Sequence, residues 1–344
     1  FTFVSVFCYL GPTYGYNAIV GAVLVGGIIE GILGLLAKYW LRLITPIVAA
    51  TVETAIGFSL LSVGAASFGG GSGSETFGSA TNWILGTFTL LCCILFNIFA
   101  KSYFKQLSVL FGLIMGYIAA VILGAVDFSS LEGTSIIAFP QLLPFKPEFN
   151  INAIISVTLI FLVSATETIG DTSALAAAGL NREATLKETS GSIACDGFIS
   201  ALSSVFGCLP ITSFSQNVGL VTMTKVVNRM ALACGAGVLI LCGLFPKLAA
   251  LISIMPQSVL GGAAVMMFSS IVVSGIQLIT KEKLTGRNIT IVSVALGLGY
   301  GLGANSDILR MLPDTMQLIF GGSGIVPAAI VALVLNIVLP KDEA

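Results

Sequence analysis

Two acids spaced four residues apart are the first candidates for chemistry. Glu167 and Asp171 follow the uncharged run 151–166. On a helix, residues i and i+4 share a face, so both carboxyl groups would point the same way. A carboxylate in an apolar region is costly unless it is protonated, paired or facing a wet cavity. The pattern predicts a ligand contact at Glu167 and a proton-linked or structural partner at Asp171; the alternative is a helix that ends in solvent near Glu167.

The second candidate is the amide pair Gln216-Asn217, which follows Pro210 and a β-prone piece, 211–214, and precedes a short apolar helix. Irregular backbone inside a membrane is tolerated only where it is buried in protein or lines a cavity. A helix that begins there directs free N–H groups and a partial positive charge at its mouth. The Gln216 amide offers a donor and an acceptor, as the edge of a heterocyclic base requires. The pair therefore predicts a ligand site, with an interhelical amide bond as the alternative.

Three other acids have less defined roles. Asp196 stands near the start of a short apolar span, where a solvated terminus and a position behind the site are equally good interpretations. Glu30 and Glu53 lie within apolar runs, and packing between domains explains them better than ligand binding.

Other kinds of chemistry are not indicated. The seven cysteines lack metal-ligand spacing and the chain has no histidine, so we expect no metal site and no cofactor. The arrangements that hydrolysis requires are missing, which argues against an enzyme. The fifteen basic residues are scattered rather than gathered in a stripe, which argues against nucleic-acid binding.

The elements that hold these residues must lie in a membrane. Only 9% of the residues are charged and 56% are hydrophobic, against about a quarter charged in soluble domains. Roughly 20 apolar residues cross about 30 Å of hydrocarbon. Runs near this length lie at 17–37, 43–66, 81–100, 106–126, 151–166, 230–246, 257–279, 288–303 and 324–339. Shorter pieces at 1–14, 191–209 and 211–224 would cross as broken or partial elements, which makes about twelve spans.

The placement of charge predicts the orientation. If the loop after Tyr39 is cytoplasmic and loops alternate, twelve of the fifteen basic residues lie inside. Only Lys146, Lys247 and Arg310 lie outside. This split follows the positive-inside rule and predicts a cytoplasmic C-terminus.

A faint repeat relates the two halves of the chain. Segment 34–38 ends in a lysine that Pro46 follows, and segment 243–247 ends in a lysine that Pro256 follows, at an offset of about 210 residues. The two lysines fall on opposite sides of the membrane, as in an inverted repeat. The same offset places 1–5 opposite 211–215, so we expect a short β-strand at both places.

The repeat also predicts that part of the first half is missing. If the second half begins near Phe149, its partner would begin roughly 60 residues before Phe1. We therefore expect two spans to precede this chain.

At this point the chain resembles the nucleobase-ascorbate transporter family. The segment 216–225, Gln-Asn-Val-Gly-Leu-Val-Thr-Met-Thr-Lys, matches the family signature Gln/Glu/Pro-Asn-x-Gly-x-x-x-x-Thr at every fixed position. Segment 165–171 resembles the eighth span, whose glutamate binds the base, and Asp196-Gly197 resembles the ninth. Segment 1–5 looks like the strand of the third span, where an aromatic residue borders the ligand.

The resemblance implies an all-α polytopic membrane protein of fourteen spans in two inverted repeats of seven, with two short β-strands in broken spans. About twelve spans would be present here, the first two being absent. The core domain would comprise 1–40 and 150–253, and the gate domain 43–128 and 256–339. The resemblance also implies a homodimer in the lipid of the plasma (inner) membrane and symport with H⁺ or Na⁺.

Site residues carry over by position. The base would be contacted by Glu167, Gln216 and the backbone of Phe214 and Ser215, flanked by Phe3 and shaped by Asn217, while Asp171 and Asp196 support coupling or structure.

The first signature position indicates the substrate. Family members similar to uracil permeases usually carry glutamate there, whereas those similar to xanthine or uric acid permeases carry glutamine, as Gln216 does. We expect import of a purine nucleobase, xanthine or uric acid, by cation symport, and the expected cation is H⁺, with Na⁺ as the alternative. A permease for uracil or another nucleobase, an anion carrier of similar fold and a passive facilitator remain alternatives.

Overall fold

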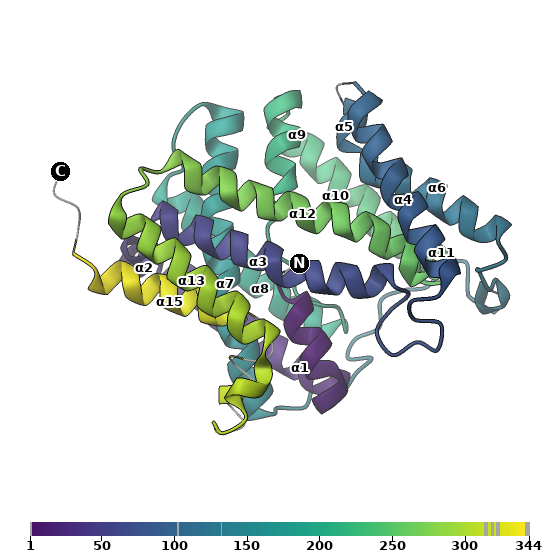
Figure 1. Cartoon of the computed structure of the whole chain (residues 1–344), viewed down its shortest axis with the longest axis horizontal. Helices are drawn as coiled ribbons and strands as arrows, with labels where there is room; N and C mark the ends of the chain where they lie inside the picture. The colour runs from purple at the N-terminus through teal and green to yellow at the C-terminus, as the bar shows by residue number, and fades with distance from the viewer. Residues whose placement is uncertain are drawn as a thin grey trace. The chain divides into compact units, whose positions relative to one another are not determined.

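The computed structural model describes residues 2–101, 103–131, 133–312, 316–317, 320 and 324–340. Helices and loops make up this part of the chain (Figure 1). The longer helices are α1 (Val4–Leu35), α3 (Pro46–Phe68), α4 (Ala80–Phe99), α6 (Ser108–Ile122), α7 (Ile151–Leu175), α8 (Leu186–Val205), α10 (Arg229–Gly243), α12 (Gln257–Lys281), α13 (Gly286–Ala304) and α15 (Ile325–Val338). The shorter elements are α2 (Ala37–Trp40), η1 (Leu41–Leu43), α5 (Tyr103–Gln106), η2 (Ser129–Leu131), η3 (Ala176–Leu180), α9 (Gln216–Thr224), α11 (Pro246–Ser253) and η4 (Ser306–Leu309).

Several helices are suited to a lipid environment. Among the described residues, five helical stretches are long and apolar enough to cross a membrane: Val6–Leu35, Pro46–Phe68, Ala80–Phe99, Ile151–Leu180 and Gln257–Lys281. The pair α10 and α11, bent by 81°, adds a sixth if it forms one span. These features agree with the predicted all-α polytopic membrane protein. They do not confirm the predicted count of about twelve spans.

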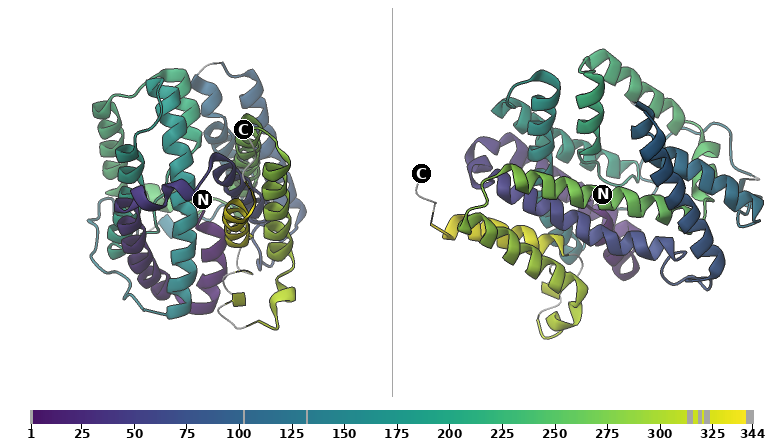
Figure 2. Two further views of the ribbon diagram at one scale, coloured as in Figure 1. Left: turned by 90° about the vertical axis from the view of Figure 1, so that its left-hand side faces the viewer. Right: turned by 45° about the horizontal axis from the view of Figure 1, so that its top comes forward.

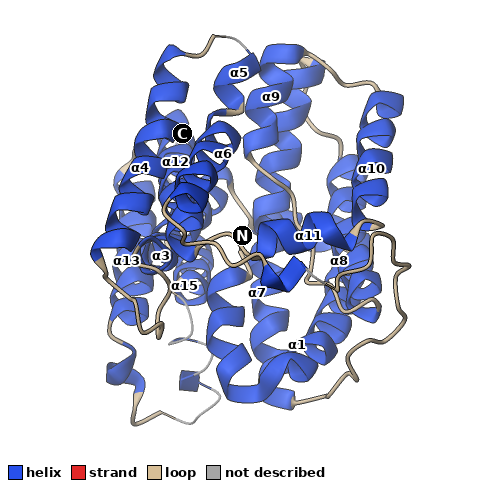
Figure 3. Ribbon diagram, turned by 90° about the vertical axis from the view of Figure 1, so that its right-hand side faces the viewer, coloured by secondary structure: helices blue, strands red, loops and turns tan. Residues whose placement is uncertain are grey.

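The two predicted β-strands are not found in the described part of the chain (Figure 3). Phe1 lies outside it, the next two residues form a turn, and α1 begins at Val4. The second segment is neither helix nor strand, and the Ser200 hydroxyl bonds to both the N–H (3.0 Å) and the C=O (3.1 Å) of Ile211. A β-strand is stabilised by backbone hydrogen bonds to a neighbouring strand. Here a side chain satisfies these backbone groups, so the β-prone composition does not produce a strand.

Helix α1 is interrupted near its start. Gly15 has φ 79° and ψ 168°, a non-helical conformation that glycine adopts without the steric penalty of a Cβ atom. Pro12 lies one turn earlier and lacks the N–H of a regular helical bond. The break separates the residues predicted as a partial element, 1–14, from those predicted as a span, 17–37.

One compact unit contains residues 1–60, 141–218 and 270–344. In this unit α1 (purple) lies alongside α7 and α8 (teal) (Figure 2). A Cβ atom added at Gly27 would come within 2.6 Å of the Gly197 carbonyl oxygen, so the α1–α8 contact depends on glycine. This close packing sets the backbone of α1 directly against the helix that carries Asp196.

Local interactions outside the apolar region fix the start of α8. Thr185 and Glu188 form a capping box, in which each side chain accepts the backbone N–H of the other residue. Arg182 donates to both oxygens of Glu188 and, with the Thr185 bonds, holds the pKa of this carboxyl well below its ordinary range. The sequence Thr-x-x-Glu therefore determines where α8 begins.

A second compact unit contains residues 61–140 and 219–269. Here α4 packs on α6, around a buried cluster of Leu85, Ala120 and Val259. The division into a core domain and a gate domain stays a prediction, because the two compact units do not test it.

Candidate functional site

Helix α7 carries both acids of the predicted site. It runs unbroken from Ile151 to Leu175, so Glu167 and Asp171 lie one turn apart in its last third. The alternative in which the helix ends near Glu167 is therefore wrong. Asp171 is only 6% exposed, which means that its carboxyl group must find partners inside the protein.

Asp171 finds these partners in the segment before α9. Its Oδ2 atom accepts hydrogen bonds from the hydroxyls of Ser213 (2.6 Å) and Ser215 (3.1 Å). Both serines directly precede the predicted signature, which begins at Gln216. The carboxyl group on α7 thus anchors the backbone that leads into the signature helix.

Asp196 on α8 belongs to the same network. Thr168 of α7 donates to its Oδ2 atom over 2.5 Å. The Thr168 hydroxyl lies 3.4 Å from that of Ser213. These contacts favour a position of Asp196 behind the site over a solvated helix terminus.

The irregular segment 211–215 is held from two sides. Ser164 of α7 shares a 2.8 Å hydrogen bond with the Thr212 hydroxyl, and Ser200 of α8 holds Ile211. Non-helical backbone at membrane depth needs such internal partners. The hydroxyls of α7 and α8 supply them.

Glu167 has a partner that the sequence analysis missed. The buried hydroxyl of Thr2 donates to Glu167 Oε2. The repeat offset of about 210 residues pairs Thr2 with Thr212, and this correspondence could have drawn attention to it. Next to it, Phe3 is 5% exposed and its ring packs edge-on against Phe161 at 4.7 Å between centroids.

The signature residues begin α9. The backbone N–H of Asn217 donates to the Phe214 carbonyl (2.9 Å), and that of Val218 donates to the Ser215 carbonyl (3.0 Å). Gln216 is the first residue of the helix, but its side chain lies outside the part of the chain that the structure describes. The predicted contacts of Gln216, Asn217, Phe214 and Ser215 with a base stay predictions.

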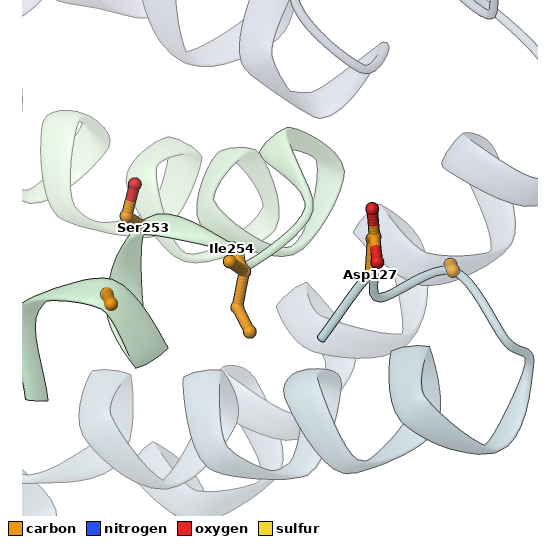
Figure 4. Close-up of a pocket in the computed structure, with 5 residues that line it drawn as sticks. Asp127, Ser253 and Ile254 are labelled. Atoms are coloured by element: carbon orange, nitrogen blue, oxygen red, sulfur yellow. The ribbon is translucent and has the colours of Figure 1, made fainter. Parts of the chain in front are cut away.

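A cavity of about 490 Å³ belongs to the second compact unit (Figure 4). It is lined by Ala125, Asp127, Ala250, Ser253 and Ile254. Hydrogen bonds from Ser129 hold the pKa of the Asp127 carboxyl below its ordinary value. None of the predicted site residues is among those that line this cavity.

The network of α7, α8 and segment 211–215 can be compared with known proteins. A model of the Permease family, Xan_ur_permease, matches residues 1–308. The chain belongs to this family. The predicted family relationship is thereby confirmed, and the permease is a transporter rather than an enzyme.

Individual relatives support the same family assignment. The permease is 33% identical over 355 residues to the xanthine permease XanQ of Escherichia coli strain K12, covering 99% of this chain and 76% of the relative. It is 33% identical to the uric acid permease PucK of Bacillus subtilis, covering 98% and 78%. It is 34% identical to the nucleobase transporter PlUacP of Paenibacillus larvae, covering 98% and 77%. Together with the apolar helices, these matches make the permease a multi-pass membrane protein.

Proposed function

We propose that this permease imports a purine nucleobase, xanthine or uric acid, together with a cation. The proposed cation is H⁺. The observation that carries the proposal is the anchoring of the signature segment on α7: Ser213 and Ser215 bond to Asp171, one turn from Glu167. These bonds tie the start of α9 to the part of α7 that carries Glu167. The names of the relatives, a xanthine permease and a uric acid permease, support a purine.

In the proposed site, polar groups read the edge of the base. The Glu167 carboxyl and the Gln216 amide bond to its N–H and C=O groups, with the backbone of Phe214 and Ser215 beside them and Phe3 at its flank. The Thr2 hydroxyl orients Glu167. Protonation of a carboxyl group in this network would couple uptake of the base to the proton gradient.

An inverted repeat of seven and seven spans is part of the proposal, with core and gate domains as predicted. Gly15 and Lys225, separated by the repeat offset, both have positive φ angles, 79° and 54°. Each stands where a short helix ends before a longer one: the leading part of α1 before its remainder, and α9 before α10. Equivalent breaks in the two halves support the repeat. A homodimer in the inner membrane with a cytoplasmic C-terminus completes the proposal.

Uptake by the full-length protein in cells tests the function. Labelled xanthine, uric acid and uracil are compared with and without a protonophore. We expect xanthine or uric acid to accumulate, uracil to be excluded, and the protonophore to abolish accumulation. Accumulation of uracil would indicate a uracil permease, and equilibration that the protonophore does not affect would indicate a passive facilitator.

A further inference from the structure

Ser200 on α8 has a fully buried hydroxyl that makes two hydrogen bonds to one residue. Its side chain is 0% exposed. The hydroxyl donates to the Ile211 carbonyl oxygen over 3.1 Å and accepts the Ile211 backbone N–H over 3.0 Å. A hydroxyl offers one donor and two acceptor positions, so a single side chain can satisfy both backbone groups. Ser200 therefore holds Ile211 by the same backbone groups that a neighbouring strand would use.

The chain between α8 and α9 turns back along α8 to bring Ile211 to this hydroxyl (Figure 3). Gly207 has φ 71°, a left-handed conformation that glycine adopts without the steric penalty of a Cβ atom. After the turn, the Ser203 hydroxyl of α8 donates to the Leu209 carbonyl over 3.1 Å. Pro210 has no N–H, so Ile211 is the next residue whose backbone can donate. Two serines of the last turns of α8 thus guide the returning chain.

The alternation of side chains shows what would be lost if the chain after Ile211 slipped by one residue. Ser213 and Ser215 both donate to Asp171 Oδ2, whereas Thr212 shares its hydrogen bond with Ser164. Residues two positions apart share a face of an extended chain, and neighbours point to opposite faces. A slip of one residue would exchange the two faces and break these contacts.

We propose that Ser200 is a positioning residue for the base site, because its hydroxyl fixes the register in which segment 211–215 reaches the base. Ser200 holds one end of this segment and Asp171 holds the other. The backbone of Phe214, proposed above to contact the base, lies on the short stretch between these two anchors. The inference rests on the proposed nucleobase function and adds a residue of α8 that does not itself touch the base.

Ser204, one turn further along α8, provides a matched control. It is 1% exposed, so its burial equals that of Ser200. Its hydroxyl donates over 2.7 Å to the Ala201 carbonyl, within its own helix. Ser204→Ala therefore removes an equally buried hydroxyl without removing a contact to segment 211–215.

Equilibrium binding of labelled xanthine and labelled uric acid to the purified full-length protein tests this role. The Kd per folded molecule is measured for wild type, Ser200→Ala and Ser204→Ala. A residue that only stabilises the fold would change the amount of folded protein, but not the affinity of the molecules that remain folded. We expect the Kd to rise about tenfold in Ser200→Ala and to stay within about twofold of wild type in Ser204→Ala.

The outcomes separate this inference from the proposed function. The same Kd for Ser200→Ala and Ser204→Ala would overturn the role of Ser200 while leaving the nucleobase function intact. A wild-type protein that binds neither xanthine nor uric acid would overturn the proposed function, and with it this role.

A second variant decides the matter if Ser200→Ala fails to fold. Ser200→Cys nearly keeps the volume of the side chain, but a thiol is only a weak donor and a weak acceptor. We expect the Kd of folded Ser200→Cys to rise at least about threefold, because Ile211 is held less firmly. Wild-type affinity in this variant would overturn the role of the Ser200 hydroxyl.

Discussion

The acids on α7 and α8 differ from the acid on α1 in how their carboxyl oxygens are satisfied. On α7 and α8, Asp171 and Asp196 accept hydrogen bonds from hydroxyls of Ser213, Ser215 and Thr168. On α1, Glu30 is more deeply buried, and both of its oxygens lack a partner in the described part of the chain. Burial alone therefore does not mark a site in this permease. The supply of hydroxyl donors distinguishes the acids that organise the signature segment.

The largest effect is expected at Glu167, the acid predicted to contact the base. Glu167→Gln keeps the shape of the side chain but removes its charge and its capacity to accept two strong bonds. We expect xanthine uptake to fall about 100-fold or more, which corresponds to about 2.7 kcal/mol. The matched control is Glu148→Gln, an exposed acid before α7, which should transport normally. Uptake by Glu167→Gln within threefold of wild type would remove Glu167 from the site.

A smaller effect is expected from the donors to Asp171. Ser213→Ala removes the 2.6 Å bond and Ser215→Ala removes the 3.1 Å bond. Loss of a hydrogen bond to a charged group costs about 1.5–3 kcal/mol. We expect the KM for xanthine to rise about tenfold in Ser213→Ala and less in Ser215→Ala. The same KM in both variants and wild type would show that this anchor does not shape the site.

Glu30 should respond in the opposite sense. A buried acid without hydrogen-bond partners costs free energy, and an apolar residue in its place removes that cost. We expect Glu30→Leu to raise the thermal unfolding temperature of the purified protein and to leave xanthine uptake within about twofold of wild type. Asp171→Leu serves as the comparison and should lower the unfolding temperature. If both variants lose stability equally, hydroxyl supply does not separate the two groups of acids.

The smallest effect is expected at the exposed pair Arg182 and Glu188. The pKa of Glu188 is lowered in the folded state, so its stabilising contribution is present above the unfolded pKa of about 4.3 and is lost as pH falls further. In Glu188→Gln the unfolding temperature should be slightly lower at pH 7 and should approach that of wild type at pH 3. Glu183→Gln is the control. A difference between wild type and Glu188→Gln that grows on acidification would contradict the sign of this shift.

The sequence predicts the long helices better than it predicts the contacts within the site. Apolar runs marked the long helices, and the i, i+4 spacing correctly stacked Glu167 and Asp171 on α7. The strand predicted at 211–215 failed because strand propensity depends on a partner strand, and here Ser200 satisfies the backbone of Ile211.

The contact between Thr2 and Glu167 joins residues 165 positions apart, and local pattern carries no information about such a pair. For the same reason the sequence carried no sign that Asp196 has a hydroxyl donor and that Glu30 has none among the described residues. Both stand in similar apolar surroundings.

The most direct test of the proposed site is equilibrium binding of labelled xanthine to the purified full-length protein, with wild type and Gln216→Ala compared under identical conditions. The account predicts at least tenfold weaker binding by Gln216→Ala, about 1.4 kcal/mol, because the variant lacks the amide that bonds to the base. Unchanged affinity in a folded Gln216→Ala protein would contradict the assignment of the signature segment to the purine site.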